Sequence, residues 1–314
     1  MNILTYALRR IIALLMIMGG VFFLSQNAVM GDTAPTILLL NSDTSVEKYR
    51  EAQVAFLKAF SEPVITVDLG DEKVDASDVQ DILYDEEPEV IYCIGSKAYL
   101  IANKHAPKTP IVFSSIINWL RMPVTKSING VSNELHAGME LMLFRYIFPT
   151  FQHFGVLYSG EYTEEWFDNA KAEAREMGVT LIGKKISKPK QVVPALKKIL
   201  PKVDAFWLIS DPNVMSAKKD LLAILKACDA QHIPVLSYHE AFADIGATMA
   251  VAADNPTIGG QAASIVQEIL AGNPLDEAVQ FPAGTSIVLN LKKVNEYDLS
   301  YSADALLGVN RIIE

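Results

Sequence analysis

The chain has 314 residues, of which 50% are hydrophobic, and a formal net charge of −10 at pH 7. This length and composition exclude a disordered or fibrous protein and allow one or two sizeable cores. The excess of acidic residues argues against nucleic acid or anionic lipid as a partner, because both require clustered Lys and Arg.

The N-terminal segment differs from the rest of the chain. Arg9 and Arg10 precede an unbroken apolar run over residues 11–24, which is shorter than the roughly 18 to 20 residues that span a bilayer. We therefore predict a secretory signal over residues 1–31, with an uncleaved membrane anchor as the alternative. No Cys stands directly after the apolar run, at the place where a lipid would be attached, so a lipid-anchored form is not expected. Cleavage would change the formal net charge from −10 to −12, because the segment holds two Arg and no acidic residue.

Short apolar runs then alternate with helical patterns. Because nearly continuous apolar strands joined by helices are typical of a parallel sheet covered on both faces, the pattern predicts a first α/β unit. The strands expected in it cover residues 36–41, 64–70, 89–95, 111–115 and 129–133. The helices expected between them cover residues 45–60, a short segment after Ser77, and residues 97–104.

A long apolar helix over residues 136–148 leads to a second series with the same plan. Its expected strands cover residues 153–159, 179–186, 205–210, 234–239 and 247–254, and its helices begin near residues 164, 191 and 214. A further helix is predicted over residues 256–271, with Asn255 as its N-cap and Gly272 at its end. A strand over residues 285–291 and a closing helix over residues 303–313 complete the chain. We therefore predict an α/β protein with two Rossmann-like lobes, each built on a parallel sheet, and a cleft between them.

Motifs for catalysis or cofactor binding do not stand out. The five His have no metal-ligand spacing, and the sequence has no nucleophile elbow, phosphate loop or dinucleotide fingerprint. Cys93 and Cys228 lie in apolar patterns, which favours two buried free thiols over a disulfide. We expect a binding protein without metal or cofactor, and an exported enzyme is the less favoured alternative.

Several segments in a characteristic order resemble one known family. They are IVFSS, NGVSN, FGVLYS before an acidic helix start, VDAFWLISDPNVMSA, IPVLSYHE and VLNLKKVNEYDLSYS. In this order the chain resembles the substrate-binding proteins of ABC transporters, in the branch whose better-known members bind tryptophan or tyrosine. The resemblance implies the type I periplasmic-binding fold with a hinged cleft. The run SSIINWLR departs from the small, acidic run usual in the family, which weakens any transfer of tryptophan specificity.

The resemblance also implies how the chain is divided and what it does. The N-terminal lobe would contain residues 35–133 and 255–285, and the C-terminal lobe residues 134–254 and 286–314. The protein would be a monomer outside the cytoplasmic membrane. It would bind a small molecule, expected to be an amino acid and to include aromatic amino acids, and deliver this molecule to an ABC permease with its ATPase. The alternative is a periplasmic sensor that presents its closed state to a membrane receptor or kinase.

Ligands of open parallel sheets lie beyond the carboxyl ends of the strands, where helix N-termini converge. In the first lobe this rule selects Asn41, Ser42, Gly95, Ser96, Ser114 and Ser115. In the second lobe it selects Tyr158, Ser159, Asp211, Asn213, Tyr238 and Asp254. Ser96 is the candidate for a ligand carboxylate and Asp211 for an ammonium group, although Ser42, Ser96 and Asp211 could equally be helix caps.

Aromatic residues bear on the class of ligand. Trp207 is expected in the core of its strand, whereas Trp119 could line the rim of the cleft. Tyr162 and Phe167 fit a hydrophobic staple around Thr163, so the pattern does not require a ligand to explain them.

Overall fold

The computed structural model describes residues 35–123 and 128–314. Residues 36–314 form one compact unit. The predicted secretory signal lies outside the described residues. Within the described part of the chain, no helix has the length and apolar character needed to cross a membrane.

The first lobe is built on a six-stranded sheet in which every pair of neighbours is parallel, in the order β11-β5-β4-β3-β1-β2. Its strands are β1 (Ile37–Asn41), β2 (Ile65–Asp68), β3 (Val90–Ile94), β4 (Ile111–Ser114), β5 (Ile128–Val131) and β11 (Val279–Gln280). Ile37 and Leu39 of β1 pack in one buried cluster, while Leu38 and Leu40 pack in another. Both faces of the sheet are therefore covered, which explains the continuous apolar strands in the sequence.

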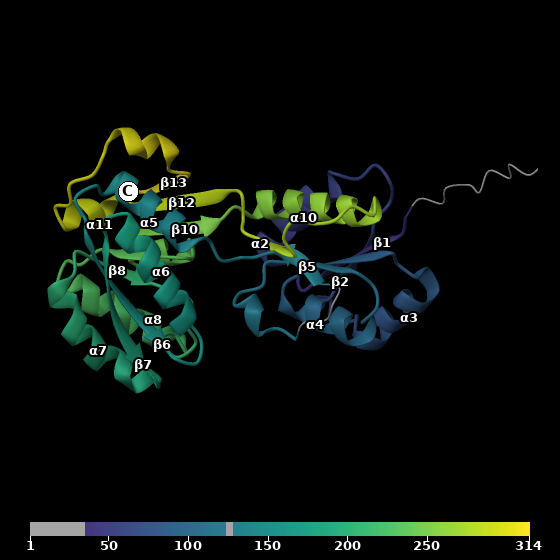
Figure 1. Cartoon of the computed structure of the whole chain (residues 1–314), viewed down its shortest axis with the longest axis horizontal. Coiled ribbons are helices and arrows are strands. Elements are labelled where there is room, and N and C mark those ends of the chain that lie inside the picture. The colour runs from purple at the N-terminus through teal and green to yellow at the C-terminus, as the bar shows by residue number, and fades with distance from the viewer. Residues whose placement is uncertain (1–34, 124–127) are drawn as a thin grey trace, which may run out of the picture. The chain divides into compact units, whose positions relative to one another are not determined.

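Helices cover the two faces of this sheet (Figure 1). They are α2 (Glu47–Leu57), α3 (Ala76–Glu86), α4 (Ser96–His105) and α10 (Asn255–Leu270), with a short 3-10 helix at Trp119–Arg121. Helices α10 and α2 pack together, and α10 also contacts β3, β4 and β5. A Cβ atom on Gly259 would lie 2.1 Å from the carbonyl oxygen of Ala52. Glycine at this position is what allows α10 and α2 to approach so closely.

The second lobe is built on a seven-stranded sheet in the order β13-β12-β10-β9-β8-β6-β7. Only β10 and β12 pair antiparallel among the described neighbours of this sheet. Its strands are β6 (His153–Ser159), β7 (Thr180–Ile186), β8 (Ala205–Leu208), β9 (Val235–Ser237), β10 (Met249–Ala253), β12 (Thr285–Asn290) and β13 (Arg311–Ile313).

Helices of the second lobe belong to two buried clusters. Buried residues of α5 (Ala137–Ile147) and α6 (Glu164–Glu176) join one of them. Those of α7 (Val192–Ile199) and α8 (Lys218–Asp229) join the other. The remaining elements are α9 (Ala241–Asp244), α11 (Leu291–Glu296) and 3-10 helices at Pro189–Gln191, Leu200–Lys202 and Asp304–Gly308.

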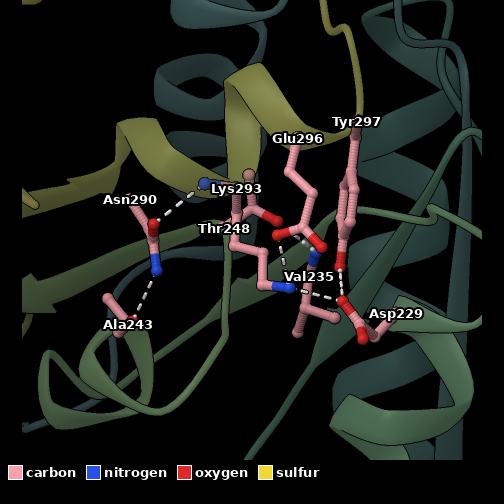
Figure 2. A network of polar contacts seen from close by, with 8 residues as sticks. All are labelled: Asp229, Val235, Ala243, Thr248, Asn290, Lys293, Glu296 and Tyr297. Atoms are coloured by element: carbon pink, nitrogen blue, oxygen red, sulfur yellow. Dashed lines mark hydrogen bonds and ion pairs between the residues drawn. The ribbon is translucent and has the colours of Figure 1, made fainter. Parts of the chain in front are cut away.

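A polar network fixes α11 to α8 (Figure 2). The Lys293 ammonium pairs with the carboxylates of Asp229 and Glu296, and the Tyr297 hydroxyl donates to Asp229 at 2.6 Å. Asn290 joins the same region, because its amide donates to the Ala243 carbonyl at 2.9 Å. These contacts hold the C-terminal part of the chain against the lobe.

The chain passes between the two sheets three times. It leaves the first sheet after β5, returns to it after β10 through α10, and leaves again between β11 and β12. Each lobe is therefore made of segments that are distant in the sequence. The exact boundaries expected for the two lobes stay a prediction.

Several local expectations were wrong. The closing helix expected over residues 303–313 is instead a 3-10 helix followed by β13, which pairs with β12. Helix α8 begins at Lys218 rather than near residue 214. Helix α10 is capped by Asp254, which accepts the Thr257 N–H at 2.9 Å, and Asn255 is its first residue.

Candidate functional site

A cavity of about 600 Å³ lies between the lobes, at the carboxyl ends of strands from both sheets. The first sheet contributes the segments that follow β4, β5 and β11. The second lobe contributes the ends of β8 and β10, the segment after β9, the start of α5, and α6 with the residues just before it. This volume is in the range of sites for small organic ligands.

Aromatic side chains form much of the wall. They are Trp119, Tyr162, Trp166, Trp207, Tyr238 and Phe281. The rings of Trp166 and Trp207 meet edge to face, with centroids 5.0 Å apart. Trp207 is 1% exposed, so it is a core residue as predicted and also part of the wall. Trp119 lines the cavity, as the sequence allowed.

Glu140 is the most buried acidic residue in the wall. It lies in the first turn of α5 and is 6% exposed. Burial raises the pKa of its carboxyl to about 8, and the nearby Glu134 carboxylate adds to this effect, whereas a hydrogen bond with the Trp207 side chain opposes it. The structure shows no ion pair for Glu140 among the described residues.

Glu134 lies on the segment between β5 and α5. Its carboxylate accepts hydrogen bonds from the Asn118 backbone N–H and, at 3.2 Å, from the Ser132 hydroxyl. Burial raises the pKa of Glu134, although these hydrogen bonds act in the opposite direction. Two carboxyl groups with raised pKa values therefore share one cavity.

Charged residues at the rim are engaged with each other or with rings. His136 Nδ1 lies 3.2 Å from a Glu173 carboxylate oxygen, which also accepts the Gly138 N–H at 2.7 Å. The Arg121 guanidinium lies 3.8 Å from the centre of the Tyr162 ring, a geometry of cation–π attraction. No group of His, Cys, Asp and Glu in the described ranges has the arrangement of a metal site.

The cavity lies at the carboxyl ends of the strands, where we expect the ligand contacts, but of the twelve candidates only Tyr238 is among the described residues that line it. In the first lobe, the Asn41 amide donates to the Gln53 side chain at 2.7 Å. The Ser42 hydroxyl accepts the Ala98 N–H at 3.0 Å and so caps α4. Gly95 has φ 83°, and a Cβ there would lie 2.7 Å from the Ser42 oxygen.

The other first-lobe candidates also lie outside the cavity wall. Ser96 is half-buried at the first residue of α4. The Ser114 hydroxyl lies 2.7 Å from the Tyr92 hydroxyl. Ser115 has φ 59°, and its buried hydroxyl has no hydrogen-bond partner among the described residues. Ligand contacts for these residues remain predictions.

Asp211 and Ser159 are paired with each other inside the second lobe. One Asp211 oxygen accepts the Ser159 N–H at 2.8 Å, the Ser159 hydroxyl at 2.7 Å and the Thr163 hydroxyl. The other accepts the N–H groups of Asn213 and Val214. Asp211 is 2% exposed, and no described helix begins beside it, because α8 starts only at Lys218. It therefore stabilises a turn and the start of its neighbouring segment rather than capping a helix, and a ligand contact for it stays a prediction.

Three further candidates lie elsewhere in the second lobe or at its edge. Tyr158 stacks on Phe167, with centroids 4.2 Å apart. Asn213 is half-buried beside Asp211. The Asp254 carboxylate caps α10.

Sequence reasoning missed Glu134 and Glu140. The second of these carried a readable signal, because Glu140 stands in the apolar stripe of α5 together with Ala137, Leu141 and Phe144. A carboxylate on the buried side of a helix requires a partner or a function.

A family comparison bears on the role of this cavity. Residues 67–310 match the sequence profile of the family described as ABC transporter substrate binding protein. The chain belongs to this family. ABC substrate-binding proteins of this kind are extracytoplasmic and bind ligands rather than catalyse reactions. A search of curated proteins gives no match.

Several solved structures share the fold of this chain. The ligand-free, open structure of CD0873, a substrate-binding protein with adhesive properties from Clostridium difficile, has a TM-score of 0.69 at 15% identity over 88% of this chain and 99% of that one. An ABC domain in complex with L-Trp from Streptococcus pneumonia has a TM-score of 0.60 at 17% identity and covers 89% of this chain and 99% of that chain. A conserved domain protein from Vibrio cholerae has a TM-score of 0.58 at 18% identity and covers 88% of this chain and 99% of that chain. The fold is the type I periplasmic-binding fold, as predicted.

Proposed function

We propose that this chain is the exported solute-binding component of an ABC importer. It captures a small molecule in the cavity between its lobes and delivers it to a membrane permease driven by an ATPase. The small molecule is an amino acid, and aromatic amino acids are among the candidates. Family membership supports the binding role. The L-Trp bound to one protein of the same fold supports the choice of amino acids for a first panel.

The cavity itself is the observation that carries the proposal. It is lined from both lobes, it measures about 600 Å³, and its wall combines aromatic rings with carboxyl, amide and hydroxyl groups, as sites for small organic ligands do. The three passages of the chain between the sheets, near residues 134–136, 254 and 286, would form the hinge. Closure about this hinge would bury the ligand and present both lobes to the permease.

The bound molecule can be identified from the protein as purified. We expect denaturation of the exported protein to release a small molecule that mass spectrometry detects, and a thermal-shift screen to give stabilisation by the same compound. The screen should contain amino acids, sugars, nucleosides and small anions. No released compound together with a flat response across the screen would contradict the proposal.

A pair of variants locates the binding in the cavity. Trp166→Ala removes a wall ring and should weaken binding of the identified compound at least about 10-fold, because buried aromatic contacts dominate such sites. Tyr84→Ala is the matched control, since this ring on α3 is 82% exposed and lies outside the wall. Equal affinity of both variants and the wild type would exclude the cavity.

Delivery to a permease requires a separate test. A strain without this gene should take up the radiolabelled compound more slowly, and the wild-type gene should restore uptake. Normal uptake in the deletion strain would contradict the transport role and favour a sensory one.

A further inference from the structure

The described wall of the cavity is strongly acidic. Its acidic residues are Glu134, Glu140, Glu165 and Glu173, and it contains no Lys. Of its two basic residues, His136 is engaged with Glu173 at 3.2 Å, and Arg121 lies over the Tyr162 ring. Positive charge within the described wall therefore does not balance the carboxyl groups of Glu134 and Glu140.

Glu140 is the decisive residue because it is 94% buried at the wall and forms no ion pair among the described residues. A buried carboxylate without a cation is unfavourable, whereas a cation beside it gains strong attraction in an environment with little water. The aromatic rings around the cavity add to this preference, because their faces attract cations.

Resting on the proposed function, we infer that the cavity recognises its ligand through a positive charge. The ligand is a small organic cation, with an ammonium group beside Glu140 and Glu134 and an apolar or aromatic body against Trp166 and Trp207. A carboxylate on the ligand is not required. An amino acid would thus bind through its ammonium group, and the corresponding amine without a carboxylate would also bind.

Protonation of Glu140 gives this recognition a signature. With a pKa of about 8, the carboxyl holds its proton near neutral pH in the empty cavity, and an approaching cation favours its ionised form. The other charged or titratable residues of the described wall are Glu134, Glu165, Glu173, His136 and Arg121, together with the phenols of Tyr162 and Tyr238. Binding at pH 7 should therefore release up to one proton, and affinity should rise between pH 6 and pH 8.5.

Matched ligands test the requirement for the ammonium group. Each of three series contains an amino acid, the amine without the carboxylate and the acid without the ammonium group, all with the same apolar or aromatic body. The series are tryptophan, tryptamine and indole-3-propionate; tyrosine, tyramine and 3-(4-hydroxyphenyl)propionate; and leucine, isoamylamine and 4-methylpentanoate. In at least one series, calorimetry should show binding of both ammonium compounds and binding at least about 10-fold weaker for the compound with only a carboxylate. Equal binding of the carboxylate-only compound would overturn the inference.

Variants test which carboxyl groups recognise the cation. Glu140→Gln keeps the size of the side chain and should weaken the best amine at least about 10-fold, with loss of the proton release. Glu134→Gln should weaken it in the same direction. Glu176→Gln is the control, since this carboxylate at the end of α6 is exposed and lies outside the described wall of the cavity. Wild-type affinity for the amine in both Glu140→Gln and Glu134→Gln would overturn the inference, and circular dichroism verifies that each variant is folded.

The two proposals fail in different ways. If no ammonium compound binds but a sugar, nucleoside or anion does, the cation inference is wrong and the proposed solute-binding function stands. If nothing in the full panel binds and no compound is released from the purified protein, both are wrong.

Discussion

Replacement of Glu140 by Gln should make the folded protein more stable, by an amount that grows as the pH rises. The wild-type carboxyl has its pKa raised from 4.5 to about 8 by burial and by the neighbouring Glu134. Between these two values the unfolded chain has lost the proton while the folded protein keeps it. The folded state then binds more protons than the unfolded state, so the free energy of unfolding falls with increasing pH. Gln has no proton to lose and is free of this effect.

The magnitude follows from the two pKa values. Each pH unit in this window changes the free energy of unfolding by up to about 1.4 kcal/mol. Between pH 5.5 and pH 8.5 the wild type should therefore lose about 3 kcal/mol relative to Glu140→Gln, and above pH 8 the difference should level off.

Urea unfolding followed by tryptophan fluorescence and circular dichroism measures this difference at the two pH values. Glu165→Gln serves as the control, because its exposed carboxyl should give a difference close to zero at both. A wild-type protein that differs from Glu140→Gln by the same free energy at pH 5.5 and pH 8.5 would refute the reasoning. Such a result would mean that Glu140 is charged and satisfied in the folded state.

Three further expectations concern packing and stability. Gly259→Ala places a methyl group against the Ala52 carbonyl and should lower the free energy of unfolding by about 1 to 3 kcal/mol in urea titrations. An unchanged urea midpoint would show that α10 and α2 pack less tightly than the structure indicates. Lys293→Met removes the cation that pairs with Asp229 (Figure 2) and should cost about 1 kcal/mol, less at high salt, because these side chains are partly exposed; a cost that is independent of salt would point to lost packing instead. Both cysteines are buried and burial raises the pKa of each thiol, so Ellman's reagent should react with two thiols in urea and with none in the native protein at pH 8.

Much of the fold was predictable because strands buried on both faces are nearly continuous apolar runs. Residues 36–41 and 89–95 are examples, and both form strands close to the expected bounds. Pairings between distant segments were not readable in the same way. The segment 311–313 was expected to be helical, but it pairs with β12, and nothing local in ALLGVNRII indicates that partner.

The candidate site was predictable only as a place. The carboxyl ends of the strands do meet at the cavity, yet the polar side chains there serve different purposes. Asp211 accepts hydrogen bonds from five donors of its own lobe. Three of these donors belong to Ser159 and Thr163, which lie 52 and 48 positions earlier in the chain, so the sequence around Asp211 does not reveal them. By contrast, Glu140 is marked locally by its position in an apolar helical stripe, a signal that periodicity could have found.

The position of the bound ligand decides most directly whether the cavity between the lobes is the binding site. A crystal structure of the protein with the tightest compound of the matched series would show this directly. We predict electron density for the ligand in the cavity between the lobes, with its ammonium group within hydrogen-bond distance of the Glu140 carboxylate and its body against Trp207. Density at the ends of β1 and β3, beside Ser42 and Ser96 and away from Glu140, would contradict the account.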